Sequence, residues 1–210
     1  MKRKLVIIEL IKEHIINNTT GYIIMLAAFV AGICSGSFFT GTMGEQLTGE
    51  LGSFMNNFTT AVCDGKMSAT SVFLDGILGN FQMIFLIYML GMTVIGLPFI
   101  MIVIGVKGFS IGFTTAAAIK FVGTKGVAAV FFTILPGELL IVPALLMMSV
   151  CAMGFSIKMI KGRTEKFLHK ENLWNEVARY TLITGLLFTV IVIAVAYEAW
   201  LSPVFAGWIN

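Results

Sequence analysis

The sequence predicts an all-α, polytopic integral membrane protein with about five transmembrane helices and an N-terminal amphipathic helix at the membrane surface. Hydrophobic residues make up 58% of the chain and charged residues only 12%, which is about half the charged share of a soluble domain. The stretch 91–147 is apolar almost throughout, far longer than one buried helix needs. These features place the whole chain, 1–210, in a single integral membrane domain.

The composition gives little support to two other classes of protein. The formal net charge of +3 is too small to indicate a nucleic-acid partner. The three cysteines are scattered over two apolar segments and one polar loop, which is typical of small apolar fillers rather than of a disulfide framework or a metal site.

Residues 1–20 are expected to form a cytoplasmic amphipathic helix that lies on the inner membrane surface. The apolar residues within 6–15 share one broad helical face, and charged residues occupy the other. The basic start at 2–4 favours contact with anionic lipid. His14 falls within the apolar arc, so packing at the interface explains it better than a role as a pH sensor or ligand.

The first span is expected at about 22–41. Along it Ala28, Gly32 and Gly36 stand four residues apart, which gives one helix face a ridge of small residues. Close packing against another helix of the same chain explains such a ridge. The alternatives are the seam of a homo-oligomer or a docking site for another membrane protein.

Residues 42–80 are expected to form an extracytoplasmic loop, the one long polar segment between spans. Within it, apolar residues recur at helical spacing and predict a short amphipathic helix: Leu47, Leu51, Phe54 and Phe58. This helix is expected either to lie on the membrane surface or to offer its apolar face to a partner.

The second and third spans are expected on either side of Lys107. The second covers about 81–106, with Asn80 as its N-cap and a kink at Pro98. The third, 108–121, is short and carries a second ridge of small residues at helical spacing: Gly108, Gly112 and Ala116.

The fourth span, about 127–157, is too long for one straight crossing. Pro136 and Pro143 interrupt it, so we expect a short helix, a break, and then the crossing proper. The last span, about 181–200, is expected to end at 201–203, where Pro203 lies.

The distribution of basic residues predicts the orientation of the chain. The N-terminus and the linker 158–180 are both rich in lysine and arginine, so both are expected in the cytoplasm. Four spans separate them, which puts 42–80 outside the cell. The fifth span then leaves the C-terminal tail outside.

The sequence shows no catalytic constellation. His14 and His169 are far apart, and no cluster of histidine, cysteine and carboxylate residues has the spacing of metal ligands. No phosphate-binding loop occurs either. We therefore expect a protein that is not an enzyme and that holds no cofactor or metal.

Several charged residues fall close to membrane depth, where a charge is costly. Lys107, Lys120, Lys125 and Glu198 are expected near span ends, where long side chains reach the interface. Glu138 directly follows the Pro136-Gly137 break. It is expected to cap the freed N–H groups of the following helix, with a role in conduction or coupling as the alternative.

Short motifs in a characteristic order run through the apolar part of the chain. They are Gly96-Leu97-Pro98, Lys107-Gly108, Gly112-Phe113, Leu135-Pro136, Ile141-Val142-Pro143-Ala144, Ala178-Arg179-Tyr180 and the closing segment 197–203. In order and spacing they resemble the stage II sporulation protein M family. The resemblance covers nearly the whole chain and is weakest in the outer loop.

The resemblance implies a non-enzymatic scaffold for engulfment during sporulation. In that family the protein works with stage II sporulation proteins D and P, which degrade peptidoglycan, and brings them to the septum. The implied location is the cell membrane, on the mother-cell side of the septum and of the engulfing membrane. The alternative is a permease-like transporter or channel subunit, whose broken helices line a path. Against it, the chain has no visible internal repeat, and its charges are expected near span ends.

Overall fold

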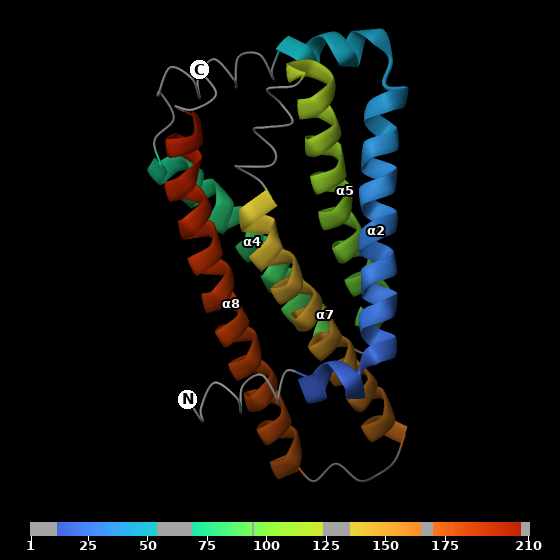
Figure 1. Ribbon diagram of the computed structural model, residues 1–210. Coiled ribbons are helices and arrows are strands. Elements are labelled where there is room, and N and C mark those ends of the chain that lie inside the picture. The colour runs from blue at the N-terminus through green and yellow to red at the C-terminus, as the bar shows by residue number, and fades with distance from the viewer. Residues whose placement is uncertain (1–11, 54–68, 94, 124–134, 165–169, 207–210) are drawn as a thin grey trace.

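A computed structural model describes residues 12–53, 69–93, 95–123, 135–164 and 170–206 (Figure 1). Five long helices dominate it: α2 (Thr19–Thr42), α4 (Ala69–Gly91), α5 (Gly96–Val122), α7 (Leu135–Thr164) and α8 (Lys170–Ala206). Each contains a segment long and apolar enough to cross a membrane. Two short helices, 12–17 and 45–53, complete the described part, in which no strand occurs. The predicted all-α, five-span class is confirmed.

The five helices alternate in direction along the chain. In Figure 1, α2, α5 and α8 run upward and α4 and α7 run downward. The start of α2, the end of α7 and the start of α8 therefore lie at one end of the bundle, and the end of α8 lies at the other. This is the relation that the charge distribution predicts for the N-terminus, the linker 158–180 and the C-terminus.

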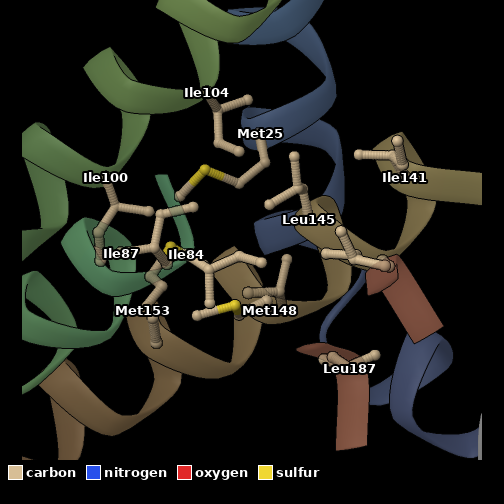
Figure 2. Close-up of a cluster of buried hydrophobic side chains, with 14 of the residues drawn as sticks. Met25, Ile84, Ile87, Ile100, Ile104, Ile141, Leu145, Met148, Met153 and Leu187 are labelled. Atoms are coloured by element: carbon tan, nitrogen blue, oxygen red, sulfur yellow. The ribbon is translucent and has the colours of Figure 1, made fainter. Parts of the chain in front are cut away.

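Packing inside the bundle involves all five helices. The buried cluster in Figure 2 includes Met25 of α2, Ile87 of α4, Ile104 of α5, Met148 of α7 and Leu187 of α8. Lipid tails are as apolar as these side chains, so the bundle is stabilised mainly by close van der Waals contact rather than by escape from water.

The outer surface of the bundle is apolar, as a lipid-facing surface must be. Phe38 of α2, Leu139 of α7 and Leu182 of α8 are among the strongly exposed side chains. Exposed Trp174 and Trp200 mark the two ends of the membrane-spanning part of α8. Tryptophan is enriched at both membrane interfaces, so this placement agrees with a transmembrane orientation of α8.

The predicted second span, 81–106 with a kink at Pro98, is wrong. α4 already begins at Ala69 and ends at Gly91, and α5 begins at Gly96. Pro98 lies in the first turn of α5, where the missing N–H is not needed. Asn80 lies inside α4 and donates from Nδ2 to the Gly76 carbonyl, so it is not an N-cap.

The turn between α4 and α5 is tied to α7 across the bundle. The Ser156 hydroxyl donates to the Thr93 carbonyl at 2.9 Å, which satisfies a backbone group that the helix break sets free. Gly96 packs so closely on the Leu90 carbonyl that a side chain there would overlap it. The break is therefore fixed by a tertiary contact and by a glycine.

No helix break occurs at Pro143, whereas the short helix expected before the break falls at 127–134, outside the described residues. α7 continues from Leu135 through Pro143 to Thr164 as one helix, with Pro136 in its first turn. The predicted short third span, 108–121, is the second half of α5. α8 likewise continues to Ala206, beyond Pro203, where it was expected to end.

The orientation of the bundle predicts which positions a membrane-impermeant thiol reagent reaches. In a Cys63→Ser background, Glu50→Cys on the helix 45–53 is expected to react in intact cells, whereas Asn17→Cys is expected to react only after permeabilisation. The native side chains of Asn17 and Glu50 are both exposed, and the two residues lie beyond opposite ends of α2. Reaction of both cysteines in intact cells would contradict the predicted orientation.

Candidate functional site

The two ridges of small residues pack against each other. α2 and α5 form the most extensive helix contact among the described elements. A methyl group at Gly32 would overlap the Gly105 carbonyl, and one at Gly36 would overlap the Phe109 carbonyl. From the other side, Gly108 and Gly112 meet the carbonyls of Phe29 and Ile33, respectively.

This contact settles what the first ridge does. Gly32 and Gly36 are buried and Ala28 is half-buried, in each case by other residues of the same chain. The ridge on α2 is therefore covered by α5 of the same chain, which supports the first explanation and leaves these glycines unexposed to a second copy or another membrane protein. Gly108 and Gly112 pack closely against another helix, as predicted.

Polar side chains connect the C-terminal halves of α2 and α5. The Ser37 hydroxyl donates to the Gly112 carbonyl at 3.3 Å, and Lys120 Nζ donates to the Thr40 carbonyl at 2.9 Å. A cation near the last carbonyls of a helix is favourable, so Lys120 stabilises the C-terminal end of α2.

Lys107 forms an ion pair inside the bundle. Its Nζ lies 2.7 Å from Glu138 Oε1, and the two side chains are only 12% and 19% exposed. Lys107 belongs to the interior of α5, well away from either end of that helix. The expectation that it lies at a span boundary and reaches the interface is therefore wrong, because that boundary was misplaced.

Glu138 lies in the first turn of α7. The N-terminal end of α7 lies well below the upper ends of α2 and α5 (Figure 1). A carboxylate is favoured at a helix N-terminus, but Glu138 binds Lys107 rather than capping the helix. Its Oε2 atom is buried and accepts no hydrogen bond from the described residues.

Glu198 of α8 completes a charged cluster with Lys107 of α5 and Glu138 of α7. Gly137 lets the Glu198 carboxyl group approach the start of α7, since an added methyl group would lie 2.7 Å from Glu198 Cδ. Glu198 lies within electrostatic range of both Glu138 and Lys107. Three helices thus bring two carboxyl groups and one ammonium group together, the arrangement that sequence reasoning missed.

The remaining predicted site residues do not join this cluster. Pro98 and Pro143 are exposed on α5 and α7, and Leu51 is half-buried in the helix 45–53. Phe54 and Phe58 lie outside the described residues. Pro136 lies in the first turn of α7. Gly112 belongs to the contact between α2 and α5.

A second polar contact holds the N-terminal helix 12–17 against the bundle. His14 Nε2 lies 3.5 Å from Cys151 Sγ of α7, Nδ1 lies 3.5 Å from Asn18 Nδ2, and the ring packs edge-on against Tyr22. Burial, and then the nearby Arg179 charge of α8, lower the pKa of His14 below 6.5.

This environment predicts that acid weakens the docking of the N-terminal helix. The unfolded state binds a proton more readily than the folded state, so the contribution of neutral His14 is fully present above about pH 6.5 and is lost as the pH falls from there through the lowered pKa of His14. We expect the melting temperature to fall between about pH 7.5 and about pH 5.5 by less in His14→Gln than in the wild type. An identical fall in both proteins would contradict this assignment.

Fold and site together define a multi-pass membrane protein held by a glycine contact and a buried charged cluster. The family model described as stage II sporulation protein M matches residues 25–203. The chain therefore belongs to the stage II sporulation protein M family and is a sporulation-related membrane protein. Neither the search of curated proteins nor that of solved structures found a match.

Proposed function

We propose that the protein is a non-enzymatic scaffold that recruits the peptidoglycan-degrading stage II sporulation proteins D and P to the septal membrane, on its mother-cell side. Membership of the family over residues 25–203 is the observation that carries this proposal. The fold is compatible with it, because a bundle of five closely packed helices provides a firm membrane anchor for other proteins.

The helix 45–53 is the proposed contact for these enzymes. It lies across the ends of α2 and α5 (Figure 1), and Gly52 faces the Phe121 ring. This places it at the end of the bundle predicted to face the cell wall. Leu47 is 47% exposed on it, which leaves an apolar side chain free for a partner, whereas the glycines of α2 are already covered.

Capture of the two enzymes from sporulating cells tests this contact. Leu47→Glu is expected to reduce capture at least about tenfold, because a buried apolar anchor supplies much of the energy of such interfaces. Gln46→Glu is the matched control, since it adds the same charge at the neighbouring exposed position, and it is expected to leave capture unchanged.

Two outcomes would count against the proposal. Equal capture by Leu47→Glu and the wild type would remove the helix 45–53 as the contact. Failure of the wild-type protein to capture either enzyme would overturn recruitment itself.

A permease-like transporter or channel subunit is the second candidate. The charged cluster favours it, because ionisable residues inside a membrane bundle commonly mark ion or substrate paths. Solute or ion flux across proteoliposomes that contain the purified protein, lost in Lys107→Met, would support it over the scaffold.

A further inference from the structure

We propose that Glu138 and Glu198 hold one proton between them, which makes the charged cluster electrically neutral inside the bundle. The proposal concerns a proton-binding site and applies whether the protein is a scaffold or a transporter.

The first step is the charge count. Lys107 carries one positive charge, and its ion pair with Glu138 compensates one carboxylate. An ionised Glu198 would leave the cluster with a net charge of minus one. An uncompensated charge in apolar surroundings is far more costly than a neutral carboxyl group. One further positive charge must therefore accompany the cluster.

The second step is an unfilled hydrogen-bond position. Glu138 Oε2 is buried and accepts no hydrogen bond from the described residues. Such an oxygen is costly unless a donor reaches it. A carboxyl group can donate a hydrogen bond to another carboxylate only when it is protonated. The Glu198 carboxyl group lies against Gly137, the residue that precedes Glu138 in the chain.

The third step concerns the other groups around Glu198. Among the described residues, the charged groups within electrostatic range of it are Glu138 of α7 and Lys107 of α5. Lys107 Nζ is already bound to Glu138 Oε1. The geometry thus points to a proton shared by the two carboxyl groups, with Lys107 holding the pair in place.

Infrared spectroscopy of the full-length protein in a detergent without ester groups tests the proposal directly, because phospholipid esters absorb in the same region as a protonated carboxyl group. At neutral pH the wild type is expected to show the C=O stretching band of a protonated carboxyl group, which is absent from ionised carboxylates. Glu198→Gln is expected to remove this band. Glu176→Gln, which changes an exposed carboxylate paired with Lys158, is the matched control and is expected to retain it.

Thermal unfolding gives a second, independent readout. Glutamine has the shape of a protonated glutamate and can donate to Glu138, so Glu198→Gln is expected to melt close to the wild type. Glu138→Gln breaks the ion pair with Lys107 and leaves only Glu198 to balance that charge, so it is expected to melt lower than Glu198→Gln.

Three results would overturn the proposal. The first is a wild type without the carboxyl band at neutral pH, and this result decides the matter even if Glu198→Gln fails to fold. The second is a band that persists in Glu198→Gln. The third is a melting temperature that falls sharply when sodium and potassium are replaced by a bulky organic cation, because a bound monovalent cation would then supply the missing charge.

Discussion

Gly112→Leu is expected to abolish the packing of α2 against α5, the largest effect of any single substitution considered for this protein. A leucine side chain would have to occupy the space of the Ile33 backbone, and a backbone cannot move aside as a flexible side chain can. Overpacking typically costs about 1–3 kcal/mol and sometimes more, and here two helices must separate. We therefore expect a destabilisation of at least about 3 kcal/mol.

The measurement is the melting temperature of the purified protein, together with its elution as a single species in detergent. Gly185→Leu is the matched control. It makes the same substitution inside α8, where an added side chain meets no atom within 4 Å. If Gly112→Leu and Gly185→Leu behave alike, close approach of α2 and α5 is not what holds this part of the bundle.

Lys107→Met is the second substitution with a large expected effect. It leaves the Glu138 carboxylate without its counter-ion inside the bundle. Removal of one partner of a buried ion pair typically costs about 3–5 kcal/mol, and we expect a loss near the lower figure because Glu138 lies in the first turn of α7. The double variant Lys107→Met with Glu138→Met is expected to recover most of that loss.

Lys158→Met provides a matched control for the ion pair. The Lys158–Glu176 pair is nearly as short, at 2.8 Å, but its side chains are 62% and 42% exposed. An exposed pair typically contributes less than about 1 kcal/mol, so the melting temperature is expected to change little. A similar fall for Lys107→Met and Lys158→Met would contradict the assignment of Lys107 to a buried cluster.

The number of spans could be predicted from the sequence, whereas their boundaries could not. Five apolar segments follow from hydropathy, because every backbone group in lipid must be satisfied within a helix. The segment 81–106 carries no charge, so neither hydropathy nor charge marks a break within it. The break depends on the contact between Ser156 and Thr93, two residues far apart in sequence.

The misplaced boundary also hid the charged cluster. A boundary at Lys107 makes its charge inexpensive, whereas a helix from Gly96 to Val122 puts it in the interior, where a counter-ion is needed. The signal was present in Gly96 and Pro98, since proline favours the first turn of a helix. With α5 placed correctly, the later spans offer Glu138, Glu176 and Glu198 as possible acidic partners.

The two ridges of small residues show a different limit. The spacing of Gly32 and Gly36, and of Gly108 and Gly112, predicts that each helix approaches another closely. Spacing does not identify the partner, because any other small-residue face fits equally well. The structure shows that the two ridges are complementary, and this leaves the helix 45–53 as the proposed surface for partners.

The most direct test of recruitment is the position of stage II sporulation proteins D and P in cells that lack this protein. We predict that both enzymes are still made but spread along the membrane instead of gathering at the septum, and that engulfment stalls there. Wild-type protein is expected to restore their position, and Leu47→Glu to fail although it inserts normally. Enzymes that still gather at the septum in the deleted strain would contradict the scaffold account.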